Sequence, residues 1–323
     1  MLSSLLILGC GSTAFSAATV EDNESVKAIY EKIEEGRTVL YDENNNEIPV
    51  EKLNNDTENI SKKLPQKYDL RDYGRVSKVK NQGSEGYCWA FASVASMESS
   101  ILSQNDLKSK LGENPQDTID LSEAGQTWYI HSGIVDKSSP FYGDYINDSS
   151  KGSNGGTSDT LAISLNSGFG TYPQSLCPYN EVKKGFSETL RYYSYYRLKD
   201  YSEISNNKDT LKSKIVSNGA VTVYYPSITD CYSYDYANYY SDNTCIGIGD
   251  AHLIVVVGWD DNYSKDNFTG KVKPSNDGAW LCKNSWGEHY GNDGYIWISY
   301  DTTKLAFSQY IMQDNNAYDN EYQ

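Results

Sequence analysis

The arrangement of apolar and polar residues changes along the chain and predicts a helical region followed by a sheet. After residue 88, apolar side chains recur at the spacing of a helix with one buried face: Phe91, Val94, Ala95, Ile101 and Leu102. Glu98 interrupts this face, and we expect its carboxylate to have a partner because a bare buried charge is costly. Apolar runs at 252–258 and 280–284 and an alternating run at 294–300 predict three strands. This order indicates an α+β fold.

The N-terminal region has the pattern of an exported protein. A short apolar run at 5–8 is followed by small residues up to Ala18, which predicts a signal peptide over residues 1–18. The segment Ile7–Cys10 also resembles a bacterial lipobox, so lipid anchoring at Cys10 is the alternative to signal cleavage. No later run reaches the about 18 apolar residues that a membrane-spanning helix needs, and we therefore expect no transmembrane segment.

Three regions are expected along the chain. Residues 19–63 are charged and rich in asparagine, which is typical of a linker or pro-segment. From residue 64 to residue 323 the chain is expected to form one domain. The basic pair Lys62-Lys63 lies just before this domain, and we predict that the secreted form is a zymogen cleaved near Lys63.

Composition narrows the classes of function. The formal net charge is −16, a field that repels phosphate backbones, so nucleic acid is not an expected partner. Aromatic residues make up 13% of the chain, including 29 tyrosines, which is typical of a folded protein. Tyrosines are dense at 192–201 and 225–245, and we interpret them as surface and strand residues rather than as a binding platform. No motif predicts a metal or a cofactor.

The six cysteines show no zinc-type spacing and are too few for a disulfide scaffold. Cys88 follows a glycine-bearing loop and begins the predicted helix, where the helix dipole favours a thiolate. Cys282 is expected to be buried on a strand. Cys231 and Cys245 bracket the second tyrosine-rich segment, and the sequence leaves open whether they form a disulfide. Cys177 has no interpretation from sequence.

A thiolate nucleophile needs an imidazole partner, and the chain has three histidines. His252 opens an apolar strand and therefore has a fixed side-chain direction, whereas His131 is expected in a polar loop and His289 in a glycine-rich turn. Asn284 ends another strand and could accept a hydrogen bond from the imidazole. Trp286, two residues later, could shield that bond from water.

At these residues the chain resembles the papain-like (C1 family) cysteine peptidases. The resemblance covers residues 64–311. Besides the residues around Cys88, five motifs carry it: Leu64–Asp72, Val79–Gly83, Asn154–Gly156, His252–Asp261 and Lys283–Gly287. Through residues 259–263 the pattern is closest to bacterial secreted and cell-surface members. The resemblance implies an α+β fold of two subdomains, one helical and one β-barrel-like, with the active-site cleft between them.

The resemblance also implies roles for individual residues. Cys88 would be the nucleophile, His252 the general base and acid, and Asn284 the group that orients the imidazole. Gln82 would form the oxyanion hole with the backbone N–H of Cys88. Substrate would bind at three further residues: Gly155, Gly156 and Trp286.

Two departures from the family pattern affect these expectations. Glu85 and Ser153 stand where the family commonly has a pair of disulfide-bonded cysteines, so we expect packing alone to hold the cleft. Ala251 stands where many relatives have a residue that affects pH behaviour, which leaves the pH optimum open.

The expected function is a secreted or cell-surface cysteine endopeptidase that forms a thioester acyl-enzyme. Its expected partners are polypeptide substrates and its own pro-segment as inhibitor, and we expect a monomer. One alternative is a catalytically inactive papain-like binding module. Another is an aminopeptidase, in which Asp230 and Asp235 of the tyrosine-rich segment would hold the substrate amine.

Overall fold

The computed structural model describes the main part of the chain, residues 64–316, apart from gaps at 134–136, 139–141, 143–151, 167–168, 192 and 246–248. It also describes the backbone of two strands in the N-terminal region. The chain divides into two compact units, residues 1–63 and residues 64–323. In the first unit, β1 (Tyr30–Glu34) and β2 (Arg37–Tyr41) pair as an antiparallel hairpin. The predicted signal peptide, Cys10 and the Lys62-Lys63 pair lie outside the described residues.

The helices of the second unit come mostly before its sheet. The described α-helices are α2 (Cys88–Ser103), α3 (Asn105–Lys108), α4 (Pro115–Thr118), α5 (Glu123–His131), α6 (Ser158–Asn166) and α7 (Lys208–Asn218). Short 3-10 turns connect them and the strands: η1 (Leu70–Tyr73), η2 (Ser109–Leu111), η3 (Tyr179–Glu181), η4 (Glu188–Leu190), η5 (Thr229–Cys231), η6 (Tyr234–Tyr236) and η7 (Lys265–Asn267). The predicted helix is confirmed as α2, but the expectation that it buries one face was wrong, because nearly all of its residues are buried between two cores. No described helix is long and apolar enough to cross a membrane.

A mixed sheet of nine strands forms the rest of this unit. Its strands are β3 (Lys67–Asp69), β4 (Tyr196–Ile204), β5 (Val221–Ile228), β6 (Tyr232–Ser233), β7 (Asn238–Tyr239), β8 (Gly249–Asp260), β9 (Ala279–Lys283), β10 (Tyr295–Ser299) and β11 (Ala306–Asp314). They lie in the order β4-β11-β5-β8-β9-β10-β7-β6, with β3 added to β8. Only β10 and β7 pair in parallel among these strands of the described chain. The three strands predicted from sequence are confirmed as β8, β9 and β10.

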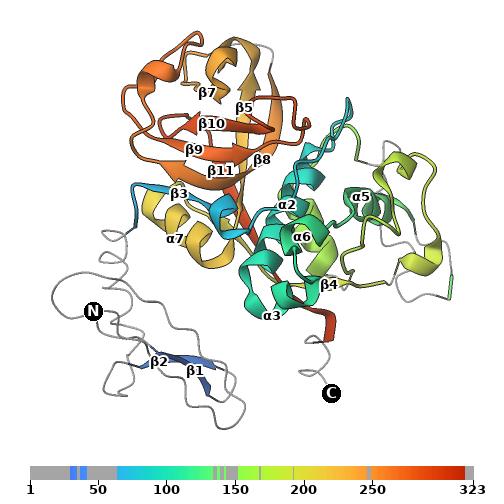
Figure 1. Cartoon of the computed structure of the whole chain (residues 1–323). Helices are drawn as coiled ribbons and strands as arrows, with labels where there is room; N and C mark the ends of the chain where they lie inside the picture. Colours follow the sequence, from blue (N-terminus) through green and yellow to red (C-terminus); the bar gives the residue numbers. More distant parts are fainter. Residues whose placement is uncertain are drawn as a thin grey trace. The chain divides into compact units, whose positions relative to one another are not determined.

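Helix α2 lies between the two halves of this unit, with α5, α6 and β4 on one side and β8, β9 and β10 on the other (Figure 1). Its side chains enter two separate cores. Trp89, Val94 and Met97 pack in a core built from the other helices together with β4 and β11, whereas Ala92 packs in the core that includes β5, β8, β9 and β10. The helix therefore carries Cys88 to the boundary between a helical half and a sheet half.

The structure assigns surroundings to four cysteines. Cys282 is fully buried on β9, as the sequence predicted, and Cys177 is buried against Tyr129 and Tyr172 in a small aromatic core. Cys231 and Cys245 are both buried thiols whose sulfur atoms lie 2.9 Å apart in a hydrogen bond. In this structure they are therefore in contact without a disulfide.

Candidate active site

Cys88 is the first residue of α2 and directly follows the loop that contains Gln82. Its side chain is half-buried and packs against the sheet core that includes Ile254 and Val255. The first turn of a helix directs N–H groups outward, and its dipole stabilises negative charge. The 16 residues of α2 therefore place this thiol where a thiolate is favoured, facing the half of the molecule that carries His252.

His252 and Asn284 are joined by a hydrogen bond. The Nε2 atom of His252 lies 2.9 Å from Oδ1 of Asn284, and the same oxygen accepts the backbone N–H of Ser285 at 2.8 Å. The Ser285 N–H identifies this atom as the amide oxygen, so Nε2 of the imidazole must be the donor. A neutral imidazole bonded in this way has its proton on Nε2 and its free lone pair on Nδ1. The arrangement therefore leaves Nδ1 able to take a proton.

Two aromatic rings surround the imidazole of His252. The indole of Trp286 stacks on it, with ring centres 4.5 Å apart and an interplanar angle of 18°. The phenol ring of Tyr225 meets it at 5.7 Å and 72°. His252 is 5% exposed. This burial lowers the pKa of His252 to about 4, although the hydrogen bond to Asn284 acts in the opposite direction.

Gln82 is fixed at both ends of its side-chain amide. Its Oε1 accepts the hydroxyl of Ser285 at 2.6 Å, and its Nε2 donates to the carbonyl of Glu85 at 2.9 Å. An amide nitrogen has two N–H groups, so one remains after the bond to Glu85. Ser285 thus contacts both Gln82 and Asn284, which links two of the residues predicted from sequence.

Gly155 and Gly156 form an exposed strip of backbone beside the start of α2. A Cβ atom on Gly156 would lie 2.7 Å from the ring of Trp89, too close for any side chain, while Gly155 has a φ of +112° and open space around it. The indole N–H of Trp89 donates to the carbonyl of Gly152 at 3.1 Å. These glycines therefore let the chain lie flat on Trp89 and leave its outer side open.

The absence of the family disulfide has a different consequence from the one predicted. The backbone N–H of Gly86 donates to the carbonyl of Ser153 at 2.7 Å. Glu85 instead forms an ion pair with Lys183 at 2.6 Å. The expectation that packing alone holds this part of the cleft was wrong, because a backbone hydrogen bond connects the two loops.

The loop before Cys88 is also bonded to the loop after Asn284. The N–H of Gln82 donates to the carbonyl of Ser285 at 2.8 Å, and the N–H of Gly287 donates to the carbonyl of Lys80 at 3.1 Å. Gly287 has a φ of +83°, a conformation that favours glycine. Residues 80–82 and 285–287 therefore form a short backbone ladder between the two halves of the site.

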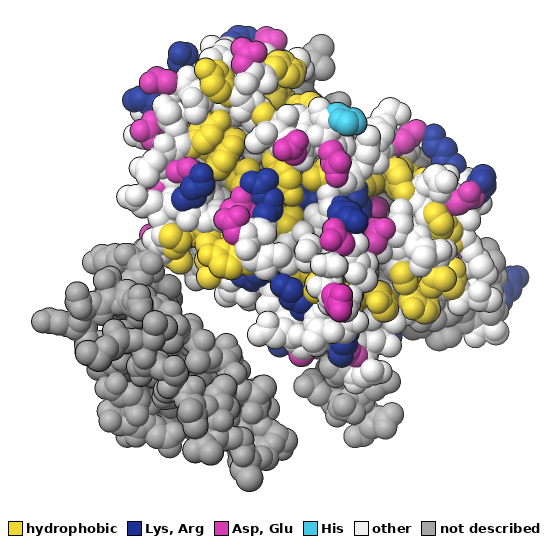
Figure 2. Space-filling view, viewed as in Figure 1, with side chains coloured by type: hydrophobic (Ala, Val, Ile, Leu, Met, Phe, Trp, Pro, Cys, Tyr) yellow, Lys and Arg dark blue, Asp and Glu magenta, His cyan; other side chains and the backbone are white. Residues whose placement is uncertain are grey.

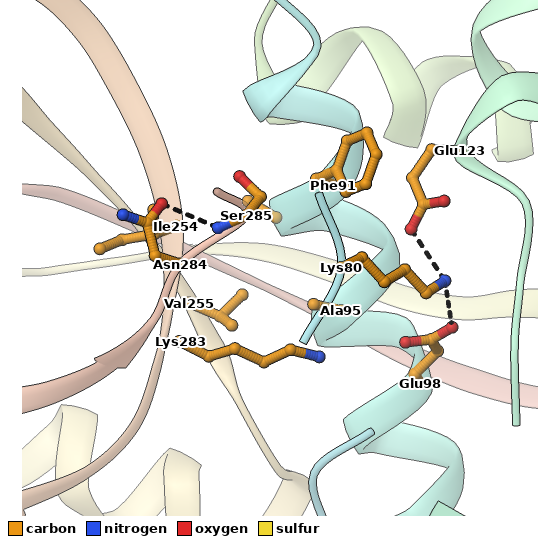
Figure 3. A pocket seen from close by; sticks show the side chains of 11 residues that line it. Lys80, Phe91, Ala95, Glu98, Glu123, Ile254, Val255, Lys283, Asn284 and Ser285 are labelled. Atoms are coloured by element: carbon orange, nitrogen blue, oxygen red, sulfur yellow. Dashed lines mark hydrogen bonds and ion pairs between the residues drawn. The ribbon is translucent and has the colours of Figure 1, made fainter. Parts of the chain in front are cut away.

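Beneath this ladder, the ammonium of Lys80 is surrounded by oxygen atoms. It contacts Glu98 at 3.0 Å, Glu123 at 2.9 Å, Asp120 at 2.9 Å and the carbonyl of Leu121 at 2.8 Å. The Glu98 side chain is 1% exposed and interrupts the apolar face of α2, so the partner expected for it exists. Figure 3 shows Lys80 between Glu98 and Glu123, with Lys283 reaching toward α2 from the sheet.

The charges of this cluster affect one another. Burial lowers the pKa of Lys80, but the carboxylates around it more than offset this effect, and its pKa lies above the ordinary value. Burial, opposed by Lys80, raises the pKa of Glu123 to about 7. Burial likewise lowers the pKa of Lys283 to about 8. Lys283 donates to Ser77 at 2.9 Å, and Ser77 donates to Glu98 at 2.5 Å, which connects β9 to α2.

A cavity of about 390 Å³ is formed by residues that follow the glycine strip and His252 in the sequence. It is lined by Thr157 and Asp159 next to Gly156, by Leu253 next to His252, and by side chains of β4, β5 and β11. Acidic and basic side chains are interspersed over the face seen in Figure 2, so the net negative charge forms no single patch there. Among the described residues, no group of three or more His, Cys, Asp or Glu side chains could hold a metal ion.

The other two histidines, His131 and His289, lie outside this group of residues. His131, expected in a polar loop, is instead the buried last residue of α5, and its Nδ1 lies 2.8 Å from the carbonyl of Thr127. His289 lies exposed in a turn. Tyr225 and the Lys80 cluster were missed from sequence, because neither the register of β5 on β8 nor a charge cluster formed by distant segments has a local signal.

Comparisons with known proteins agree with the predicted fold. A family model described as papain family cysteine protease matches residues 64–315. The chain is similar to cathepsin S of Bos taurus, with 30% identity over 247 residues that cover 73% of this chain and 60% of the cathepsin. It is 26% identical to procathepsin L of Rattus norvegicus over 238 residues, which cover 74% of this chain and 61% of the procathepsin. The chain thus matches about three fifths of the length of these relatives.

Solved structures give the same result. The clostridial cysteine protease Cwp84 after propeptide cleavage superposes with a TM-score of 0.63 and 28% identity, covering 78% of this chain and 59% of that chain. A second structure contains the cysteine protease and lectin-like domains of Cwp84, which is described as a surface layer associated protein of Clostridium difficile. It superposes with a TM-score of 0.62 and 29% identity, covering 78% of this chain and 52% of that chain. Bromelain from Ananas comosus shares the fold, with a TM-score of 0.52 and 23% identity. The match covers 77% of this chain and 100% of the bromelain chain. The predicted papain-like α+β fold is confirmed.

The burial of His252 predicts an unusual titration. In Cys88→Ala, which lacks the thiolate, we expect its imidazole to titrate near pH 4 rather than near 6.5. Between these values the unfolded chain binds a proton that the folded chain does not, so stability should decrease as pH falls through this window. NMR titration measures the pKa, and loss of one of three imidazole signals in His252→Gln assigns it. A value at or above 6.5 would contradict the described burial.

Proposed function

The chain belongs to the papain family of cysteine proteases, and on this premise we propose that it is a cysteine endopeptidase acting on polypeptide substrates. The observation that carries the proposal is the oriented pair of His252 and Asn284 on the sheet, together with Cys88 at the start of α2, which packs against the core of the sheet. The tautomer imposed by Asn284 leaves Nδ1 of His252 to exchange a proton with the thiol. A nucleophile, its base and an orienting group are the parts that covalent acyl transfer requires.

In the first half of the proposed reaction, the Cys88 proton moves to Nδ1 of His252 and the thiolate attacks the carbonyl carbon of the substrate. The carbonyl π electrons move to its oxygen, where the second N–H of Gln82 Nε2 and the backbone N–H of Cys88 stabilise the negative charge. The oxyanion then collapses, the C–N bond breaks, and His252 gives its proton to the leaving amine. A thioester on Cys88 remains.

In the second half, His252 takes a proton from water, and the resulting hydroxide attacks the thioester carbon. The C–S bond breaks, the carboxylic acid leaves, and the Cys88 sulfur regains a proton from His252. Trp286 and Tyr225 keep the imidazole out of bulk water, so its charge forms only when the sulfur becomes negative. The pair is therefore expected to react as thiolate and imidazolium.

The glycine strip and the cavity support an extended polypeptide as the substrate. The open side of Gly155 and Gly156 could pair with substrate backbone, because no side chain of this strip stands in the way. The cavity of about 390 Å³ is large enough for one substrate side chain and has an apolar wall that includes Tyr224, Leu253 and Phe307. We propose that it selects a large apolar side chain close to the scissile bond.

The aminopeptidase alternative receives less support from the described residues. Asp230, one of two carboxylates considered for holding a substrate amine, lies 3.6 Å from the Lys271 ammonium. Its charge is thereby partly compensated. The inactive binding-module alternative requires the His252–Asn284 pair to have no chemical use, although the pair is buried and oriented for proton transfer.

Replacing the proposed nucleophile tests the function directly. We expect Cys88→Ala to lose about 10⁴-fold or more of its activity on a denatured protein, because covalent catalysis is removed. It should also lose labelling by an irreversible thiol-directed epoxide. The matched control is Cys177→Ala, which removes a buried thiol that packs against Tyr129 and Tyr172 and should retain both properties.

An N-acetylated peptide distinguishes the two peptidase types in the same assay. An endopeptidase cleaves it as readily as the unblocked peptide, whereas an aminopeptidase does not cleave it. Equal activity of wild type and Cys88→Ala would overturn the peptidase proposal.

We also propose that the chain is exported and made as a zymogen, with residues 1–18 as signal peptide and 19–63 as pro-segment. Two observations support a boundary near residue 64. The carbonyl of Pro65 accepts the indole N–H of Trp259 at 2.9 Å, and β3 begins at Lys67, so the chain is fixed to β8 almost from Leu64 onward. Cwp84 is described as a surface layer associated protein, and one of its structures is described as the form after propeptide cleavage.

The zymogen proposal predicts where the active form begins. N-terminal sequencing of active protein should give a start within a few residues of Leu64, because cleavage further along would remove the bonds to β8. Cys88→Ala should accumulate uncleaved if maturation is autocatalytic. An active form that begins upstream of residue 50 would contradict the proposal.

A further inference from the structure

Three tyrosines of the segment 225–245 pack into one cluster rather than facing solvent separately. Tyr225 and Tyr239 are fully buried, with ring centres 4.8 Å apart, and Tyr232 lies 4.8 Å from Tyr239. The two strands β6 and β7 place Tyr232 opposite Tyr239 in their register. We call these three residues the tyrosine cluster. This cluster gives a structural role to tyrosines that we interpreted from the sequence as surface and strand residues.

The cluster meets the proposed base through Tyr225. In the register of β5 on β8, Tyr225 lies directly opposite His252. Their rings are 5.7 Å apart in an edge-to-face arrangement, while Trp286 stacks flat on the imidazole at 4.5 Å. The imidazole is therefore in contact with two rings of different orientation.

Hydrogen bonds fix the position of the Tyr225 ring. Its hydroxyl lies 2.5 Å from the hydroxyl of Tyr232, which also lies 3.0 Å from the hydroxyl of Ser227. The Tyr239 hydroxyl donates to the carbonyl of Pro226, the residue after Tyr225. Both the ring and its backbone are thus tied to the cluster, which makes Tyr225 a rigid neighbour of His252.

A single hydrogen bond does not define the orientation of an imidazole. The bond from Nε2 to Asn284 sets one direction, but the ring can still rotate about the line that joins the two atoms. Trp286 restricts this rotation from the face of the ring. A second ring standing at 72° to the imidazole restricts it from another direction.

We propose that Tyr225 is a positioning residue for His252, and that the tyrosine cluster holds its ring in place for this purpose. This inference rests on the proposed function, because it concerns the base of that reaction. In this proposal Tyr225 exchanges no proton and forms no bond in the reaction; it acts by limiting the rotation of the imidazole and by excluding water from it.

The test compares two substitutions that separate the ring from its hydroxyl. Tyr225→Leu removes the ring, and we expect kcat to fall about 10- to 100-fold with KM unchanged, because a misplaced catalytic group costs this much. Tyr225→Phe keeps the ring packed against His252 and should restore most of the activity. The matched control is Tyr172→Leu, which removes another buried tyrosine, one that packs in the helical half against Cys177.

The pH profile gives a readout that loss of stability alone would not move. Water admitted by Tyr225→Leu relieves the burial of His252, so the imidazole holds its proton to higher pH. The alkaline limb of kcat/KM should therefore move to higher pH in Tyr225→Leu and stay in place in Tyr225→Phe and Tyr172→Leu. The other titratable groups that act on Tyr225 or pack against it are Tyr232, Tyr239, Tyr290 and Cys282.

A measurement without substrate separates this inference from the proposed function. In the Cys88→Ala background, NMR titration should show a higher pKa for His252 when Tyr225→Leu is added, and no change when Tyr225→Phe is added. An unchanged kcat and pH profile in Tyr225→Leu would overturn the inference. If wild type hydrolyses no peptide, the proposed function fails, and the NMR titration alone then decides whether Tyr225 positions His252.

Discussion

The structure depends on the largely buried ammonium group of Lys80 at the junction of its two halves. Lys80 lies in the loop before Cys88, and its charge is surrounded by Glu98 of α2, Glu123 of α5 and the nearby Asp120. Glu98 belongs to α2, whereas Asp120 and Glu123 belong to the segment that leads into α5. A buried charge is tolerated only with such partners, so the position of Lys80 dictates how these segments meet.

This junction determines the geometry of the active site. The backbone of residues 80–82 pairs with residues 285–287, directly after Asn284, while Lys283 is joined to Glu98 through Ser77. Cys88 therefore cannot move with α2 without disturbing the loop that carries Asn284. The Cys88 thiol belongs to the helical half and the His252 imidazole to the sheet half. Contacts that involve neither residue fix the position of one half relative to the other.

Local patterns predicted the elements of this fold but not the contacts between them. Helical spacing identified α2 and the need of Glu98 for a partner, and ordered motifs identified the candidate site, because such signals lie within short segments. The partner itself, Lys80, is 18 residues away, and Glu123 is 43 residues from Lys80. The packing of Tyr225 on His252 depends on the register of β5, which the sequence does not encode locally. His131 was misplaced because its polar neighbours hid the end of α5.

The free energy of unfolding of Lys80→Met tests the importance of this junction most directly. Methionine keeps much of the side-chain volume but leaves two buried carboxylates without their cation, so we predict a loss of about 3–5 kcal/mol at pH 7. The control Lys183→Met removes an exposed partner of Glu85 and should cost less than about 1 kcal/mol. Equal losses in chemical denaturation for the two variants would contradict the account.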